Sequence, residues 1–236
     1  MAYTNHETGY EYPSVTAILG ELNKPALTYW AANCAVNHIE ANLPDVDADN
    51  PHRLGDLFKE ARTAFKDVGK AATDTGSAVH NAIEAYVKHG KDFSGSLPDA
   101  VQNGFLAFLE WEKLNHVEWL ESELTLFNSQ IYYAGTCDAI ARINGHVYLL
   151  DFKTSKSIYD EYRYQLAAYM SALILGGNPH GVERIGILRL DKETGEPEFK
   201  DITKGWRDKY DAFKALVSWY YLSKNRRVKN PRGSVK

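Results

Sequence analysis

Two aspartates in this 236-residue chain stand inside segments that otherwise resemble buried β-strands. Asp138 lies six positions before Asn144, and Asp151 lies six positions after Gly145. Asn-Gly between alternating strand-like residues is typical of a β-hairpin with a two-residue type I′ turn. The hairpin register then predicts that the aspartates face each other, with Cβ atoms roughly 4.5–5.5 Å apart. Lys153, two residues beyond Asp151, points to the same side of the sheet.

Facing carboxylates repel each other and lose solvation, so such a pair needs compensation. A shared proton is one solution, because it raises the pKa of one acid. A divalent cation is another, since carboxylate oxygens are its preferred ligands. Lys153 could also neutralise one charge, which would make the group a buried structural ion-pair cluster. We favour metal-assisted chemistry, because three charged groups lie at a strand end next to the loop Lys153-Thr154-Ser155-Lys156.

The elements that must position these residues change along the chain. The first half reads as helical, and its polar stretch 44–56 reads as a loop. Asp74 or Thr75 is expected to cap a helix that ends at Gly90. The second half is expected to contain strands at 118–127, 131–143, 146–153, 183–190 and near 198–202, and helices at 159–175 and about 205–224.

This order predicts an α/β (α+β) fold with a central mixed β-sheet flanked by helices. We expect one domain over residues 1–236. Residues 1–116 would form its mainly helical part, residues 117–222 its catalytic sheet core, and residues 223–236 a basic tail.

Composition excludes several classes of protein. Hydrophobic residues make up 44% of the chain and charged residues 25%, ordinary values for a soluble globular protein. No run approaches the roughly 18 apolar residues of a membrane span, and the first residues do not read as a signal peptide. With two cysteines there is neither a disulfide framework nor a four-cysteine iron–sulfur site. We therefore expect a cytoplasmic protein.

Charge is unevenly distributed. The net charge is −4, yet the C-terminal tail is basic and contains no acid, so it could contact a phosphate backbone or simply be a solvated end. The basic residues of this tail are Lys224, Arg226, Arg227, Lys229, Arg232 and Lys236.

A set of ordered motifs resembles a known nuclease superfamily. Asp138 followed by Asp151-Phe152-Lys153 resembles the PD-(D/E)XK signature. The longer pattern, from Gly135 to Lys156 and then Gln165 to Tyr169, is similar to the RecB-like exonuclease branch, which includes phage recombination exonucleases. The helical segment around His80 and the strand around Glu123 also match that branch. The nominal proline of the signature is Cys137 here, and the third acid is Asp rather than Glu.

The resemblance implies a restriction-endonuclease-like core and a metal-dependent DNA exonuclease. Asp138, Asp151 and the Phe152 carbonyl would bind Mg²⁺ or Mn²⁺, one or two ions, and no iron–sulfur cluster is implied. Glu123 would act nearby through water and His80 would complete a second metal position. Lys153 would position the attacking water, and Gln165 would contact Lys153 or DNA.

Some choices stay open from the residues alone. Periodicity does not distinguish Glu121 from Glu123, and only the resemblance selects Glu123. His80 and Glu84 share one side of a helix, which is compatible with an ordinary surface contact. An endonuclease on the same core, or a catalytically silent DNA-binding or assembly module, are the alternatives to an exonuclease.

The partner implied is the end of a single- or double-stranded DNA, with a role in phage recombination, replication or repair. A recombination or single-strand-binding protein is a further candidate partner. We expect the helical N-terminal half to arch over the site and admit a strand end. The residues expected to contact DNA are Gln165, Tyr169, Lys24, Trp30, Thr154, Lys156, Arg226 and Arg227.

Overall fold

The computed structural model describes residues 2–46, 51–90 and 97–223. The chain divides into two compact units. One combines the residues up to Glu21 with those from Ala78 onward, and the other spans Leu22–Ser77. The expected basic tail, including Arg226 and Arg227, lies outside the described residues.

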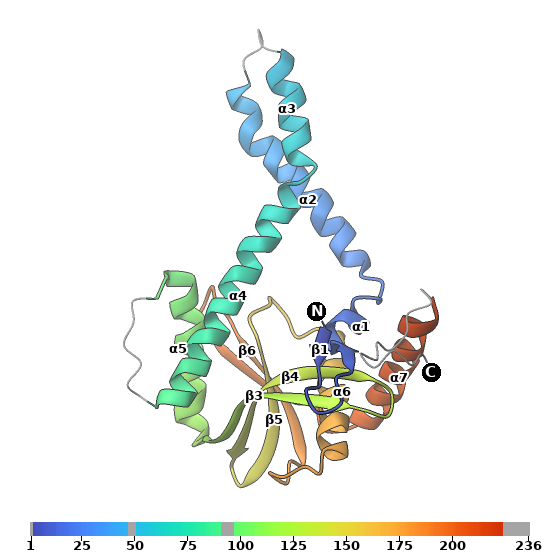
Figure 1. The fold of residues 1–236 in the computed structure, drawn as a ribbon. Coiled ribbons are helices and arrows are strands. Elements are labelled where there is room, and N and C mark those ends of the chain that lie inside the picture. The colour runs from blue at the N-terminus through green and yellow to red at the C-terminus, as the bar shows by residue number, and fades with distance from the viewer. Residues whose placement is uncertain (1, 47–50, 91–96, 224–236) are drawn as a thin grey trace. The chain divides into compact units, whose positions relative to one another are not determined.

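A five-stranded mixed sheet forms the centre of the first unit (Figure 1). Its strands follow one another in the order β3-β4-β5-β6-β7, and only the β5–β6 pair is parallel. Helix α6 (Asp160–Leu175) connects these two parallel strands. The predicted mixed α/β fold with a helical N-terminal half is therefore confirmed. The strands are β3 (Glu118–Asn128), β4 (Tyr133–Ile143), β5 (His146–Lys153), β6 (Arg184–Leu190) and β7 (Pro197–Asp201).

The hairpin that carries both aspartates has the predicted turn and register. Asn144 and Gly145 adopt positive φ angles of 49° and 83°, as a type I′ turn requires. Pairing begins at Ile143↔His146 and continues without a shift to Ala139↔Leu150. Strand β5 is the middle strand of the sheet, and its residues 147–152 are all buried, so both of its faces are covered. This explains the apolar residues on either side of Asp151.

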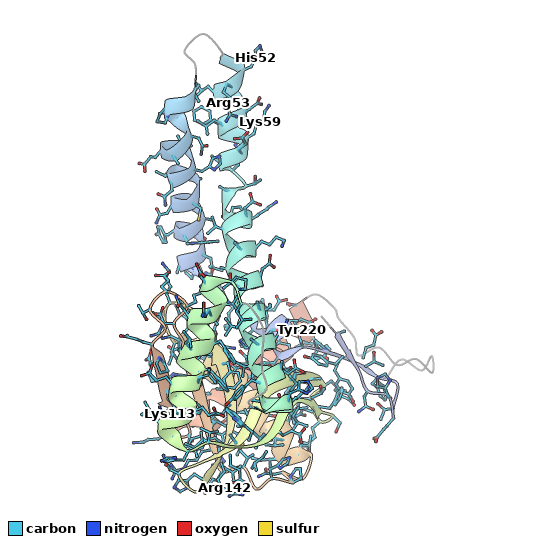
Figure 2. The ribbon with its side chains drawn as sticks, turned by 90° about the vertical axis from the view of Figure 1, so that its left-hand side faces the viewer. His52, Arg53, Lys59, Lys113, Arg142 and Tyr220 are labelled. Atoms are coloured by element: carbon cyan, nitrogen blue, oxygen red, sulfur yellow. The ribbon has the colours of Figure 1, made fainter. Side chains whose placement is uncertain are left out.

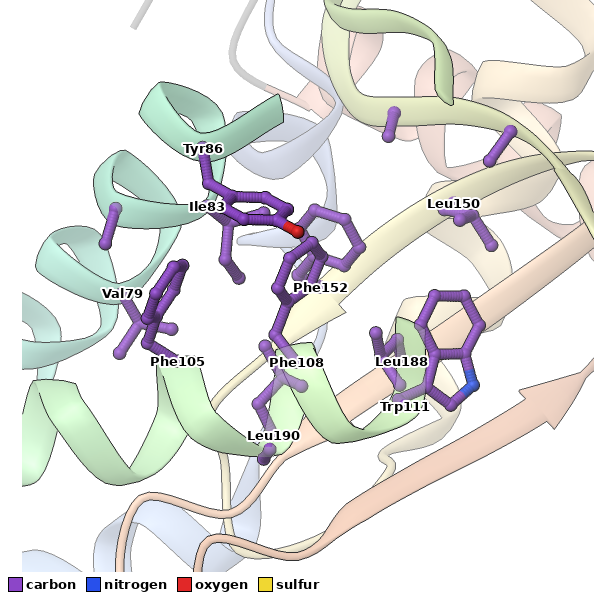
Figure 3. Close-up of a cluster of buried hydrophobic side chains, with 14 of the residues drawn as sticks. Val79, Ile83, Tyr86, Phe105, Phe108, Trp111, Leu150, Phe152, Leu188 and Leu190 are labelled. Carbon is purple, nitrogen blue, oxygen red and sulfur yellow. The ribbon is translucent and has the colours of Figure 1, made fainter. Parts of the chain in front are cut away.

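Helices α4 (Ala64–His89) and α5 (Asp99–Asn115) pack on one face of the sheet. Their aromatic and aliphatic side chains surround Phe152 and Leu188, as Figure 3 shows. Val79 and Ile83 of α4 are almost fully buried there, at 0% and 1% exposure. Because buried positions three and four apart fix the rotation of a helix, they also fix the direction of His80, which lies between them.

Helices α6 and α7 (Trp206–Ser223) pack against each other, and α6 also contacts β3, β4, β5 and β6. Gly176 and Gly177 follow the last residue of α6, where the sequence predicted its end. Helix α1 (Val15–Leu19) contacts both α6 and α7 and begins with Ser14, whose side chain accepts a hydrogen bond from the backbone N–H of Ala17.

The second unit is helical. It contains α2 (Pro25–Asn42), the 3₁₀ turn η1 (Leu43–Asp45), α3 (Pro51–Ala61) and the first part of α4. No residue of α2 is buried. Arg53 and Lys59 of α3, labelled in Figure 2, form salt bridges with Glu60 and Asp56.

Two local predictions were wrong. Helix α4 begins at Ala64, so Asp74 and Thr75 lie inside it and cap nothing. Low-propensity residues there suggested a break, but the Thr75 hydroxyl donates to the Ala71 carbonyl within the continuous helix. The stretch expected as a loop becomes helical at Pro51, a residue suited to a first helical turn. Within residues 2–13, β1 (Ala2–Thr4) and β2 (Glu11–Pro13) pair in antiparallel orientation.

No helix within the described ranges is both long enough and apolar enough to cross a bilayer.

Candidate active site

The carboxylate of Asp138 marks the place where β4 and β5 separate. Their ladder ends at Ala139↔Leu150, one pair before the two aspartates. The Phe152 backbone N–H instead donates to Asp138 Oδ2, with an N···O distance of 2.5 Å. A side chain thus replaces the strand as hydrogen-bond partner. This strand end is where the polar groups gather.

Asp151 is buried at 2% exposure and is bound from two sides. Gln165 Nε2 donates to its Oδ1 over 3.0 Å, and Lys153 Nζ forms an ion pair with its Oδ2. That second oxygen is buried and has no hydrogen-bond partner of regular geometry among the described residues, and the Lys153 ammonium lies against it. Burial raises the pKa of Asp151 to about 6, with a further rise from Asp138 and an opposing effect of Lys153.

His80 reaches the same cluster from helix α4. Its Nδ1 lies 3.4 Å from Asp138 Oδ1. Burial alone would lower the pKa of His80, but the Asp138 charge and hydrogen bond raise it above its usual value. Burial alone would raise the pKa of Asp138, but His80, Lys153 and the Phe152 N–H lower it. Both directions fit an ion pair of imidazolium and carboxylate.

Glu123 enters the cluster from β3. It lies between the pairs Ser122↔Ala139 and Leu124↔Cys137, which places it opposite Asp138 in the register. Its φ angle of 55° is rare for a residue with a side chain, and such strain often marks a functional position. Burial raises the pKa of Glu123 to about 7, and the charges of Asp138 and Glu84 raise it further.

The structure also separates the acids that periodicity left equivalent. Glu121 Oε2 lies 3.5 Å from His180 Nε2, away from the aspartates, whereas Glu123 feels the charge of Asp138. Glu84 forms an ion pair with Lys88 on the same helix. The position of Glu123 agrees with the residue that the resemblance selected.

One face of helix α6 supports the cluster. Gln165 Nε2 donates to Tyr169 Oη as well as to Asp151, each over 3.0 Å. Tyr169 is 3% exposed and lies against Gly135 of β4. The sequence placed Gln165 at Lys153 or DNA, but in the structure its amide is bound to Asp151 and Tyr169. Gln165 therefore orients the carboxylate that Lys153 pairs with.

Gly135→Ala is expected to disturb this support. A Cβ at Gly135 would lie 2.4 Å from Tyr169 Cε1, so the buried ring would have to move away from Gln165. Overpacking of this kind costs about 1–3 kcal/mol, and the melting temperature should fall by several degrees. Gly55→Ala on α3 is the control, because nothing lies within 4 Å of that Cβ and alanine favours a helix. Equal melting temperatures for the two variants would show that Tyr169 is not tightly held.

A small cavity adjoins the carboxyl ends of β5 and β6. It has a volume of about 210 Å³ and lies between the loop after Lys153 and the loop after Leu190. Lys156 Nζ lies 3.9 Å from Glu193 Oε1 at its rim, where both side chains are largely exposed. The predicted DNA contacts Thr154 and Lys156 thus lie beside the cluster. The lining residues are Thr154, Ser155, Lys156, Asp191, Lys192 and Glu193.

Other predicted contact residues lie elsewhere in the chain. Lys24 and Trp30 belong to the second unit, where the Trp30 ring packs edge-on against Phe65 with centroids 6.4 Å apart. The arch over the site stays a prediction.

The carboxylates of this cluster are of a chemical type that binds a hard divalent cation, but their present arrangement does not form a metal site. Among the described residues, no three His, Cys, Asp or Glu side chains are grouped so that they could hold a metal ion. Asp151 is bound to Lys153, and Asp138 is bound to His80 and to the Phe152 N–H. Burial is nevertheless the main cause of the raised pKa of Glu123, and the negative charges of Asp138 and Glu84 raise it further. Oxygen donors in such an environment suit Mg²⁺ or Mn²⁺, provided that the carboxylates turn from their present partners.

Comparisons with known proteins add little. No protein-family model matches the sequence, and no curated protein matches it. The chain is similar to the solved structure described as SSO0001, with 16% identity over 64% of this chain and 74% of that one. The TM-score of 0.35 is too low for this likeness to support an argument.

Proposed function

We propose that this protein is a metal-dependent deoxyribonuclease that hydrolyses phosphodiester bonds from strand ends. The observation that carries the proposal is that Glu123, Asp138 and Asp151 occupy neighbouring positions of three adjacent strands, with Lys153 paired to one of them. The resemblance of these residues to the PD-(D/E)XK signature supports the same activity.

Asp138, Asp151 and the Phe152 carbonyl would hold Mg²⁺ or Mn²⁺, with Glu123 beside them. His80 would bind a second ion as the neutral imidazole, after losing the proton that pairs it with Asp138. When bound, the ion supplies a water of lowered pKa and polarisation of the scissile phosphate. Gln165 holds the Asp151 carboxylate in orientation through its hydrogen bond. Because α4 is anchored in the core by its neighbouring residues, His80 is presented to Asp138 without a long flexible loop.

Lys153 has a water-positioning and charge-stabilising role. Burial alone would lower its pKa, but Asp151 and Asp138 raise it, so the amine is held as an ammonium. An ammonium at this place can orient the attacking water and stabilise negative charge that develops on the phosphoryl oxygens. Its 17% side-chain exposure gives it access to a substrate at the strand end.

End specificity and a role in recombination, replication or repair rest on the resemblance. The cavity beside Thr154 and Lys156 offers hydroxyl and ammonium donors for the strand next to the cleaved bond. The net charge of −4 does not oppose this, since a nuclease needs local rather than global positive charge.

The decisive experiment uses end-labelled single- and double-stranded DNA with each terminus blocked in turn, in Mg²⁺, in Mn²⁺ and in a chelator. We expect metal-dependent release of short products from one free terminus, while covalently closed circles stay whole. Cleavage of closed circles would instead identify an endonuclease. Binding of DNA without cleavage in either metal would identify a silent binding module and refute the proposal.

A further inference from the structure

Tyr162, in the first turn of helix α6, packs against the amine of Lys153. The Nζ atom lies over the tyrosine ring, 4.8 Å from its centroid. An ammonium in this position is attracted by the negative face of the ring, and the attraction is strongest where water is excluded. Lys153 keeps only 17% of its side-chain exposure, so this contact is largely shielded from solvent.

Two contacts therefore define where the amine lies: the Asp151 carboxylate and the Tyr162 ring. A lysine side chain has a flexible four-carbon stem with several rotatable bonds, so a single contact would leave its ammonium poorly fixed. If Asp151 turns to another partner, as the proposed function requires, the ring is the contact that remains. The ring is itself held, because Tyr159 packs edge-on against it with centroids 5.7 Å apart.

The same helix thus supports both members of the ion pair. Tyr162 and Gln165 lie three residues apart and share one side of α6. Gln165 binds the carboxylate and Tyr162 contacts the ammonium. Burial raises the pKa of the Tyr162 hydroxyl.

We infer that Tyr162 is a positioning residue, whose ring face holds the Lys153 ammonium in place for its work on the scissile phosphate. This inference rests on the proposed function. The element that matters is the aromatic face rather than the hydroxyl, so phenylalanine should replace tyrosine at this position.

The chain contains a matched control for this contact. Tyr164, two residues further along α6, has Lys209 Nζ over its ring at 5.4 Å. Replacing Tyr164 by leucine removes a ring of the same size and a cation contact of the same kind from the same helix. It leaves Lys153 untouched.

The first test compares Tyr162→Phe, Tyr162→Leu and Tyr164→Leu in the cleavage assay at saturating Mg²⁺ or Mn²⁺. We expect Tyr162→Leu to lower kcat about tenfold to thirtyfold with little change in KM, the size of a shielded cation–π contact. Tyr162→Phe should stay within about threefold of wild type, and so should Tyr164→Leu. Equal losses for the phenylalanine and leucine variants, or a loss confined to KM, would overturn the inference in favour of a hydroxyl role or a contact with the DNA strand.

A second test does not depend on cleavage. A double-mutant cycle of Tyr162→Leu and Lys153→Met, followed by denaturant unfolding without metal, measures the coupling between the two side chains. We expect Tyr162→Leu to destabilise the wild-type protein more than it destabilises the Lys153→Met variant. Tyr164→Leu should have the same effect in both proteins. Additive effects of Tyr162→Leu would overturn the inference, even if wild-type protein cleaved no DNA and the proposed function had failed separately.

Discussion

Asp151→Asn is expected to abolish cleavage while the fold stays intact. The variant keeps an oxygen that can accept the Gln165 hydrogen bond but loses the negative charge that would bind the cation. Loss of several kcal/mol of transition-state stabilisation corresponds to a fall in kcat of about a thousandfold or more. The measurement is single-turnover cleavage in saturating Mg²⁺ and Mn²⁺, with circular dichroism to confirm folding. Cleavage at the wild-type rate would refute the assigned role.

The stability of the same variant should depend on pH in a defined direction. Burial raises the pKa of Asp151 to about 6, above the usual value near 3.9. A carboxyl group with a raised folded-state pKa contributes stability at low pH and loses it as the pH rises through that pKa. Without metal, Asp151→Asn should therefore melt above wild type at pH 8. The difference should shrink as the pH falls from 6 to 4. A variant that melts well below wild type at pH 8 would contradict this.

The parts of the site within one hairpin could be predicted from the sequence. Asn144-Gly145 fixes the turn, and the turn fixes which residues of the two strands face each other. Asp138, Asp151 and Lys153 were therefore predictable as a group. The end of the ladder was not, because the Asp138 carboxylate replaces a backbone partner of Phe152. Such competition between a side chain and the backbone leaves no periodic signal.

Contacts between distant elements could not be derived in this way. The position of Glu123 depends on the register between β3 and β4, and this register shifts between Trp119 and Glu121. The loop that joins the two strands is longer than two residues, so it does not fix the register as a tight turn would. His80 depends on how α4 packs against the core. Family resemblance supplied both residues, whereas their spacing did not.

Tyr162 illustrates a signal that was present but unused. Tyr162, Gln165 and Tyr169 follow one another at intervals of three and four, which places them on one side of α6. That side turned out to face the ion pair, with Tyr162 at Lys153 and Gln165 at Asp151. Helical spacing thus identifies which residues act together, while the tertiary packing decides what they contact.

Lys153→Met should have the opposite effect on stability from Asp151→Asn. The ammonium is the charge that Asp151 pairs with, and Asp138 also stabilises it. Its removal leaves two buried carboxylates without that charge, and breaking a buried pair in this way costs about 3–5 kcal/mol.

For a chain of this size, such a loss lowers the melting temperature by roughly 6–20 °C. Thermal unfolding at pH 8 without metal is the measurement, with Lys113→Met, at an exposed position of α5 (Figure 2), as the control. Millimolar Mg²⁺ or Mn²⁺ should restore much of the lost stability, because a bound cation would take over the neutralising role of the ammonium. Cleavage should stay lost, since the ion cannot replace the donor that orients the attacking water. A Lys153→Met protein as stable as wild type without metal would mean that the carboxylates do not repel each other, and the physical case for a cation at this site would fail.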